Sequence, residues 1–199
     1  MTLYDLKPRF QALLRPVADR LASAGITANQ VTLAAAIGSA MLGALLAAAP
    51  TIRVLFLLLP IWLLIRMALN AIDGLLAREH RQASRLGGYL NELCDVISDA
   101  ALMLPFAFVA PFGLASVFAV IFLAALSEYA GVMGPLVGAA RRYDGPFGKS
   151  DRALAIGALG LCIGSTLSMP EWLFWIMPAF AVLLVITILN RVRAGLREP

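Results

Sequence analysis

The sequence predicts an all-α, polytopic membrane protein, and three observations support this class. Hydrophobic residues make up 61% of the 199 residues, and the mean hydropathy is +0.85, whereas a soluble domain is nearer half apolar. About six segments are apolar over the roughly 20 residues that one membrane crossing needs. Lys and Arg gather in alternate connections between these segments. No hydrophilic insert is long enough to fold alone, so residues 1–199 are predicted to form a single membrane domain.

Residues 1–25 are expected to form an interfacial amphipathic helix. Over 3–24, apolar residues at helical spacing alternate with Lys7, Arg9, Arg15 and Arg20, a pattern typical of a helix that lies in the membrane surface. A soluble amphipathic turn is the alternative. The opening residues lack the apolar stretch of a cleavable signal peptide. Residues 26–199 are expected to form the transmembrane bundle, with spans near 30–49, 53–77, 87–110, 112–138, 152–168 and 171–191.

The distribution of basic residues predicts the orientation of the bundle. The short turns near 50–53, 110–113 and 168–171 carry only Arg53 and Glu171. The connections and terminus on the opposite side carry Arg78, Arg81, Arg85, Arg141, Arg142, Lys149, Arg152, Arg191, Arg193 and Arg197. Basic residues stay on the cytoplasmic side of a membrane. Both termini are therefore expected to be cytoplasmic.

Polar residues form a stripe on each of the second and third spans. On the second span Arg66, Asn70 and Asp73 follow helical spacing and share a face, and Gly74 lies beside Asp73. On the third span Gly87, Asn91, Asp95 and Asp99 follow steps of four, and Glu92 lies on the flank of this stripe. Two antiparallel helices would bring the stripes together near the cytoplasmic surface. Charged groups in apolar helices are usually paired, metal-bound or catalytic.

Several carboxylates this close repel one another unless a positive charge lies between them. A divalent cation, Arg66 or bound protons would each satisfy this need. Oxygen ligands favour Mg²⁺ or Mn²⁺ over zinc. The structural alternative is a helix pair held by Arg–carboxylate contacts. A small transporter, in which the buried charges form a substrate path, is a third class, but the paired inverted halves typical of transporters are not seen.

The spacing of these residues resembles the motif of the CDP-alcohol phosphotransferases, also called CDP-alcohol phosphatidyltransferases. Their motif is D-x-x-D-G-x-x-A-R, eight residues, then G-x-x-x-D-x-x-x-D. The chain has N-A-I-D-G-L-L-A-R over 70–78, eight residues, and then Gly87, Asn91 and Asp95 at the family spacing. Residues 26–32 look like the family's P-N-x-x-T entry to the first span, and Gly148-Lys149 resembles its G-K element. With Asn at the first and third acid positions, the chain looks most similar to an enterobacterial branch.

The resemblance implies transfer of a phosphatidyl group from CDP-diacylglycerol to an alcohol acceptor, with release of CMP. It makes Asp95 the general base and a partial metal ligand and Asp73 a metal ligand for Mg²⁺ or Mn²⁺, a chemistry that suits this reaction. Nucleotide-binding residues implied by the family are Asn29, Thr32, Gly74, Ala77, Arg78 and Gly87. The family also implies a homodimer among membrane lipids, and no nucleic-acid partner is expected.

Asn70 and Asn91 stand where the family has acids, and each gives up one negative charge. Three interpretations stay open. Glu92 or Asp99 replaces a lost acid, so that the metal ligands come from Asn70, Asp73, Asn91, Glu92, Asp95 and Asp99. The site holds one metal ion, with Arg66 or Lys149 stabilising the remaining charge. Or the chain binds a CDP-lipid or nucleotide without transfer.

The remaining charged residues predict phosphate contacts or structural pairs. Arg66, Arg141, Arg142, Lys149 and Arg152 are candidates for binding a phosphate of the acceptor or of the CDP group, and they lean toward an anionic acceptor. Anchoring to anionic lipid headgroups is the alternative for the four residues after the fourth span. Glu128 is expected either to pair with Arg66 or to face an acceptor pocket, and Asp151 either to cap the fifth helix or to join the site.

Overall fold

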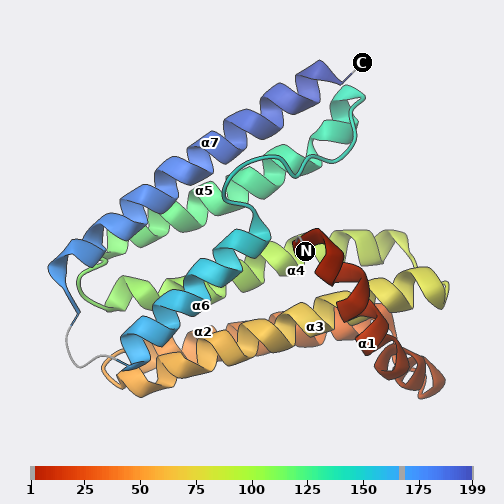
Figure 1. Cartoon of the computed structure of the whole chain (residues 1–199), viewed down its shortest axis with the longest axis horizontal. Helices are drawn as coiled ribbons and strands as arrows, with labels where there is room; N and C mark the ends of the chain where they lie inside the picture. Colours follow the sequence, from red (N-terminus) through yellow and green to blue (C-terminus); the bar gives the residue numbers. More distant parts are fainter. Residues whose placement is uncertain (1–2, 166–168, 199) are drawn as a thin grey trace. The chain divides into compact units, whose positions relative to one another are not determined.

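The computed structural model describes residues 3–165 and 169–198, and all regular structure in these ranges is helical (Figure 1). The prediction of an all-α protein is confirmed. The α-helices of the described part are α1 (Leu3–Ser23), α2 (Ala28–Ala48), α3 (Leu58–Glu79), α4 (Arg85–Met103), α5 (Leu114–Val132), α6 (Lys149–Ser165) and α7 (Ile176–Arg197). Short 3₁₀ helices are η1 (Arg53–Leu57), η2 (Leu104–Phe108), η3 (Gly134–Val137) and η4 (Glu171–Trp175).

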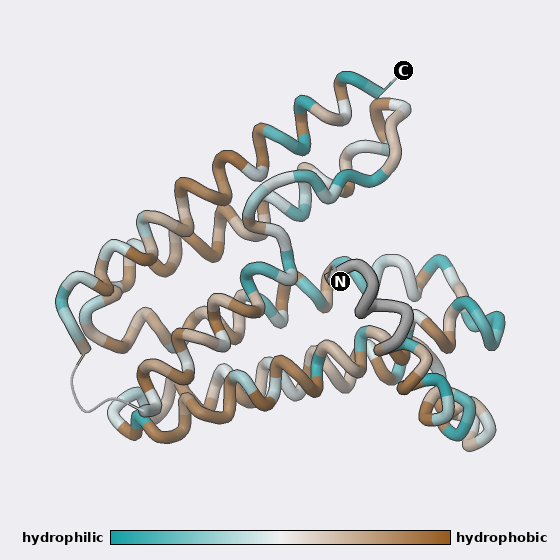
Figure 2. The backbone as a smooth tube through the Cα atoms, viewed as in Figure 1, coloured by the Kyte–Doolittle hydropathy of each residue, from teal (hydrophilic) through white to brown (hydrophobic). Residues whose placement is uncertain are grey.

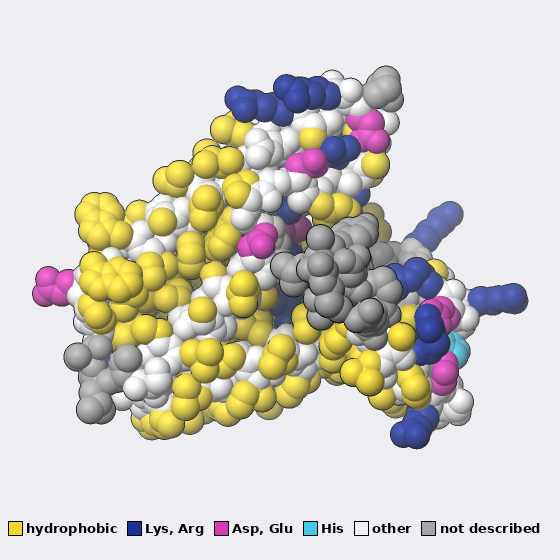
Figure 3. Space-filling view, in the orientation of Figure 1, with side chains coloured by type: hydrophobic (Ala, Val, Ile, Leu, Met, Phe, Trp, Pro, Cys, Tyr) yellow, Lys and Arg dark blue, Asp and Glu magenta, His cyan; other side chains and the backbone are white. Residues whose placement is uncertain are grey.

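Four helical segments of the described part are long and apolar enough to cross a membrane: α2, η1 with α3, α5, and η4 with α7. Hydropathy falls toward the C-terminal end of α7 (Figure 2). Apolar side chains cover much of the visible helical surface (Figure 3), which suits a lipid environment better than water. The other two predicted spans correspond to α4 and α6, which are not among these four segments. Helix α4 carries several charged residues, and α6 is only 17 residues long.

Two of the predicted spans extend too far along the chain. The third was predicted to reach residue 110, but α4 ends at Met103, and Pro105 begins a short 3₁₀ helix instead. The fourth was predicted to reach residue 138, but α5 ends at Val132 before Gly134 and Pro135. Proline removes a backbone donor and ends a helix nearby. The end of the predicted fifth span, at 166–168, lies outside the described residues.

The chain forms two compact units. Unit 1 consists of Met1–Met41 and Ile61–Ser98, and unit 2 consists of Leu42–Pro60 and Asp99–Pro199. Helices α2, α3 and α4 therefore contribute residues to both units. The motif on α3 and most of the polar stripe on α4 belong to unit 1. Asp99 and the basic residues after α5 belong to unit 2.

In unit 1, α1 packs on α2 and α3 through part of its apolar surface. Ala18 is fully buried, and Leu14 and Leu21 pack beside it, against a core formed by Ala28, Val31, Ile72, Leu75 and Leu76. Leu13 and Val17 stay exposed on the same helix. The side chains of Lys7 and Arg9 lie outside the described part of the structure. The helix thus has one apolar surface held by protein and another free for a membrane interface.

In unit 2, α5 and α7 lie side by side and pack along their lengths (Figure 1). Phe56, Phe106 and Phe112 form a buried chain of edge-to-face rings with centroids 5.9 Å apart. Glycines permit the closest approaches. A Cβ at Gly43 would lie 2.2 Å from the Ala101 carbonyl oxygen, and one at Gly160 would lie 2.9 Å from Leu59 Cβ. Small residues at such contacts allow membrane helices to pack tightly.

Candidate functional site

Asp73 of α3 is held in unit 1 by Thr32, which lies near the start of α2. Its side chain is buried, and Oδ2 accepts a hydrogen bond of 2.8 Å from the Thr32 hydroxyl. Thr32 also lies 3.1 Å from the Ala28 carbonyl oxygen, but the bond to a carboxylate is the stronger of the two. This contact joins two motifs that are far apart in the sequence, the entry to α2 and the D-G pair of α3.

Asp95 of α4 faces the polar side of α3. Its Oδ1 lies 3.1 Å from Arg66 Nη2 and 3.4 Å from Asn70 Nδ2. Arg66 also donates to the Asp95 backbone carbonyl oxygen at 3.3 Å. The guanidinium is 5% exposed and the carboxylate 14%, so both charges lie out of bulk water. A positive charge thus contacts the carboxylate that the family motif makes the general base.

Two backbone positions of the predicted nucleotide site closely contact side chains. A Cβ at Gly87 would lie 2.8 Å from Asn29 Oδ1. One at Gly74 would lie 3.1 Å from Arg78 Nη1, because the arginine folds back over the glycine. Ala77 packs against the unit 1 core. Any larger residue than glycine at Gly87 would displace Asn29, so the missing side chain has a local steric reason.

Two features that the sequence reasoning missed fix the start of α2. Thr27 and Gln30 form a capping box: Thr27 N donates to Gln30 Oε1 at 2.8 Å, and Gln30 N donates to Thr27 Oγ1 at 3.3 Å. The T-x-x-Q pattern was a sufficient signal for it. Gln82, in the loop between α3 and α4, accepts a hydrogen bond of 2.7 Å from Ala28 N. These contacts hold Asn29 and Thr32 next to the motif helices.

Unit 2 contains a buried cluster of arginines and carboxylates that we call the arginine cluster: Asp99, Glu128, Arg141, Arg152 and Arg191. Arg152 is 1% exposed and donates to Asp99 Oδ2 at 2.9 and 3.1 Å and to Glu128 Oε1 at 2.8 Å. Arg191 Nη2 lies 3.5 Å from Glu128 Oε1, and Arg141 Nη2 lies 3.6 Å from Glu128 Oε2. Arg191 also donates to the Ser127 carbonyl oxygen. From the sequence, Arg66 was the one expected ion-pair partner of Glu128. The contacts of Glu128 with Arg141, Arg152 and Arg191 were not predicted.

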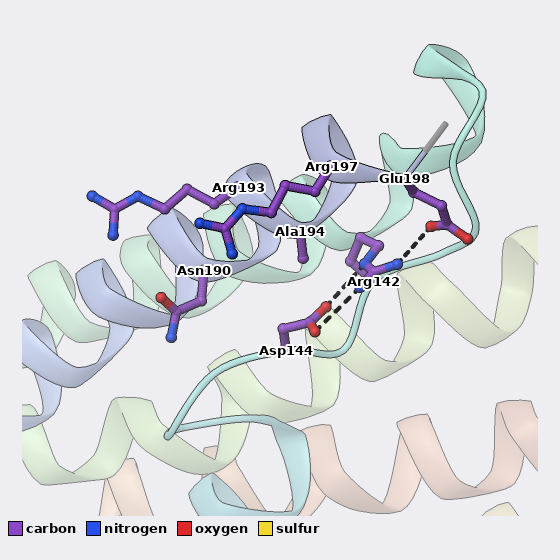
Figure 4. A pocket seen from close by; sticks show the side chains of 7 residues that line it. All are labelled: Arg142, Asp144, Asn190, Arg193, Ala194, Arg197 and Glu198. Carbon is purple, nitrogen blue, oxygen red and sulfur yellow. Dashed lines mark hydrogen bonds and ion pairs between the residues drawn. The ribbon is translucent and has the colours of Figure 1, made fainter.

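Arg142 belongs to a second polar group in unit 2, beside an open pocket of about 580 Å³ (Figure 4). It donates to both Asp144 carboxylate oxygens, at 2.9 and 3.2 Å, and to Glu198. These bonds from Arg142 lower the pKa of the Asp144 carboxyl below its usual range. Arg193 and Arg197 project from α7 over the same pocket. The predicted phosphate ligand Arg142 thus already has two internal carboxylate partners.

The start of α6 carries the Gly148-Lys149 pair. The Gly148 N–H donates to Asp151 Oδ2 at 2.9 Å, so Asp151 caps the helix, as one of its two predicted roles required. Lys149 is the first residue of α6 and is partly buried. On α4, Asn91 and Glu92 are partly buried one turn before Asp95. Within residues 3–165 and 169–198, no three His, Cys, Asp or Glu side chains form a group that could hold a metal ion.

The sequence of this chain matches the family model described as CDP-alcohol phosphatidyltransferase over residues 25–188. It is also 48% identical to inner membrane protein YnbA of Escherichia coli K12, over 98% of this chain and 97% of that protein. The chain belongs to the CDP-alcohol phosphatidyltransferase family. An archaetidylinositol phosphate synthase of Pyrococcus horikoshii is 36% identical over about half of each chain, 51% in both cases.

Two solved structures have a similar fold. Phosphatidylinositol phosphate synthase (PgsA1) of Mycobacterium tuberculosis, in complex with manganese and citrate, matches with a TM-score of 0.74 over 94% of this chain and 90% of that chain. The same enzyme with CDP-DAG bound matches with a TM-score of 0.78 over 94% and 96%. Both are 21% identical in sequence to this chain. At 21% sequence identity, the structural likeness shows a shared fold.

Proposed function

We propose that the protein transfers a phosphatidyl group from CDP-diacylglycerol to the hydroxyl of an alcohol and releases CMP, as a step of phospholipid biosynthesis. The observation that carries this proposal is the arrangement in unit 1. Thr32 contacts Asp73, and Asn70 contacts Asp95, so that α3 is hydrogen-bonded to both of the other motif segments. These are the positions to which the family motif assigns nucleotide, metal and acceptor chemistry.

In this proposal Asp95 takes the proton of the acceptor hydroxyl as general base. Arg66 and Asn70 fix the orientation of its carboxylate through Oδ1. Asp73, held by Thr32, lies one turn from Asn70 on the same face of α3. In the proposed site the nucleotide would lie against Asn29, Gly74, Arg78 and Gly87, with Ala77 behind them.

We infer that the site suits one divalent cation rather than two. Asp73, Asp95 and the Asn70 amide oxygen are the hard oxygen donors that Mg²⁺ or Mn²⁺ prefers. Two carboxylates against the Arg66 guanidinium leave a net charge of −1, which favours a single cation. When bound, this ion would offset negative charge on the diphosphate. Asn91 and Glu92 are further candidate donors, while the Asp99 carboxylate is engaged by Arg152.

The named relatives support the proposal by their own activities and ligands. The Mycobacterium tuberculosis synthase binds manganese and CDP-DAG, and the Pyrococcus horikoshii relative is a synthase of a phospholipid. The Escherichia coli relative is an inner membrane protein and fits the enterobacterial branch. We further propose that this protein lies in a bacterial inner membrane, with its termini and Asp95 toward the cytoplasm, and that it works as a homodimer; the inner-membrane relative supports the first of these points.

Release of CMP tests the proposal directly. Purified protein is incubated with CDP-diacylglycerol, Mg²⁺ or Mn²⁺ and a panel of alcohols: serine, glycerol, glycerol phosphate, inositol, inositol phosphate and a phospholipid. An Asp95→Asn variant, which keeps the size of the side chain, is the matched control. We expect wild-type CMP release with at least one acceptor and a loss of at least about 100-fold in the control. Equal rates in the two proteins with every acceptor would contradict the proposal.

Binding of a CDP-lipid without transfer is the second candidate function. The observation that favours it is the neutral Asn70 beside the Arg66–Asp95 ion pair. An amide in place of an acid at residue 70 and a guanidinium beside Asp95 each weaken the attraction of this site for cations. Binding of CDP-diacylglycerol measured by calorimetry, in a protein that releases no CMP with any acceptor, would establish this function instead.

A further inference from the structure

The open pocket of unit 2 lies between the last turns of α7 and the connection that precedes α6. Its α7 side carries Asn190, Arg193 and Arg197, which follow steps of three and four and therefore form one strip along the helix. Its other side carries Arg142 and Asp144 (Figure 4). The volume of about 580 Å³ is open to the surface, so a ligand can enter it without local unfolding.

The wall of the pocket opposite α7 is fixed by the protein itself. Phe147 N donates to the Thr187 hydroxyl at 3.1 Å, and Arg142 N donates to the Gly131 carbonyl oxygen at 3.0 Å. At Gly145, φ is +126° and a Cβ would lie 2.7 Å from Thr187 Cα, so the connection passes directly over α7. A preformed site loses less conformational freedom when a ligand binds.

The arginines of the pocket differ in how they are neutralised. Arg142 donates to both Asp144 and Glu198. Arg193 and Arg197 are exposed, and among the residues that the structure describes no carboxylate pairs with either of them. Three arginines against two carboxylates leave the pocket with a net charge of +1. The pocket therefore attracts an anion, and the donors open to that anion are the two guanidinium groups of α7.

An exposed apolar strip, formed by Leu189, Val192 and Leu196, runs along α7 directly beside these two arginines. The candidate membrane span that contains α7 ends at Arg197 and has 27 residues. It is about 40 Å long, whereas the hydrocarbon core of a bilayer is about 30 Å thick. The span thus extends into the headgroup region, and its charged end, at Arg193 and Arg197, is the end that belongs there.

We propose that this pocket binds the headgroup of an acidic phospholipid that carries a single phosphodiester. The phosphate oxygens accept from Arg193 and Arg197, the Asn190 amide pairs with a headgroup hydroxyl, and an acyl chain follows the apolar strip. A net charge of +1 suits one phosphodiester, and the added cation of a zwitterionic headgroup is repelled. The site lies within unit 2 and is separate from the motif residues, so it does not depend on the proposed transferase function.

Thermal unfolding in mixed micelles tests this site. Purified protein in an uncharged detergent receives dioleoylphosphatidylglycerol or dioleoylphosphatidylcholine at equal mole fraction. A ligand that binds only the folded protein raises its melting temperature. With phosphatidylglycerol at about ten times its dissociation constant, we expect a melting temperature about 3–6 °C above that in phosphatidylcholine. Equal melting temperatures in the two lipids would overturn the proposal.

Variants assign the effect to the pocket. Arg193→Gln combined with Arg197→Gln removes both open guanidinium groups and is expected to abolish the rise with phosphatidylglycerol. Arg20→Gln, which removes an exposed charge on α1 in unit 1, is the matched control and is expected to keep the full rise. An equal loss in the control and in the double variant would show general attraction of a basic protein for acidic lipid, and the proposal would fail.

A soluble phosphate ester offers the same phosphate chemistry without acyl chains. Glycerol 3-phosphate is therefore added in place of the lipid and compared with sodium chloride of equal ionic strength. Only the part of a rise that the double variant loses reports on this pocket, and we expect that part to be below about 1 °C. A loss as large as the loss with phosphatidylglycerol would overturn the assignment to a lipid. None of these measurements reads CMP release, so a failed transfer assay leaves them intact.

Discussion

Replacement of Arg152 by methionine is expected to destabilise the protein more than any exposed charge substitution. The arginine is 1% exposed and bridges two carboxylates that are themselves 8% and 9% exposed. Methionine fills much of the volume but leaves Asp99 without its two hydrogen bonds and Glu128 without its shortest one. Removal of one partner of a buried ion pair lowers the free energy of unfolding by about 3–5 kcal/mol.

The measurement is reversible unfolding in detergent micelles, followed by circular dichroism. For a protein of this size a change of 1 kcal/mol moves the melting temperature by roughly 2–4 °C, so a decrease of about 10 °C is expected. The double replacement Arg152→Met with Glu128→Gln should recover part of the loss, because it also removes one of the stranded charges. Arg197→Met, at an exposed arginine of α7 without a described ion pair, is the matched control. A change below about 1 kcal/mol for Arg152→Met would refute the reasoning.

Two further predictions concern the motif and the helix contacts. Asp73→Asn is expected to abolish Mn²⁺-dependent binding of CDP-diacylglycerol while leaving the fold intact, because the amide can still accept the Thr32 hydrogen bond; unchanged calorimetric binding would remove Asp73 from the cation site. Gly43→Ala is expected to destabilise by about 1–3 kcal/mol, because its Cβ would lie 2.2 Å from the Ala101 carbonyl oxygen. Gly88→Ala on α4, where a Cβ meets nothing within 4 Å, is expected instead to stabilise by about 0.5–1 kcal/mol; equal effects at both glycines would contradict the packing described.

The helices and the motif faces could be predicted from the sequence because both depend on periodicity and composition. Steps of three and four placed Asn70 and Asp73 on one face, and Asp95 was expected to meet that face; the contact between Asn70 and Asp95 follows this prediction. The C-terminal ends of α4 and α5 were predicted less accurately, because apolar residues continue in the sequence past the last residue of each helix. There Pro105 and Pro135, rather than a change in hydropathy, accompany the end of the helix.

The pairing of charges was harder to predict than their positions. Spacing along one helix says which residues share a face, but several basic residues follow α5, and nothing in their order selects the partner of Glu128. The choice of Arg152, Arg191 and Arg141 depends on how α5, α6 and α7 pack. The contact of Gln82 with Ala28 was missed for the same reason, since a single loop side chain has no periodic pattern.

The packing of α1 in unit 1 places an amphipathic helix against the core that precedes Asp73. Its Ala18 and Leu14 press on the same apolar core as Ile72, and Ile72 immediately precedes Asp73. Leu13 and Val17, on the neighbouring face of the same helix, are exposed. A tilt of α1 in the membrane surface would therefore shift the core beside Ile72 and, with it, the backbone that carries Asp73.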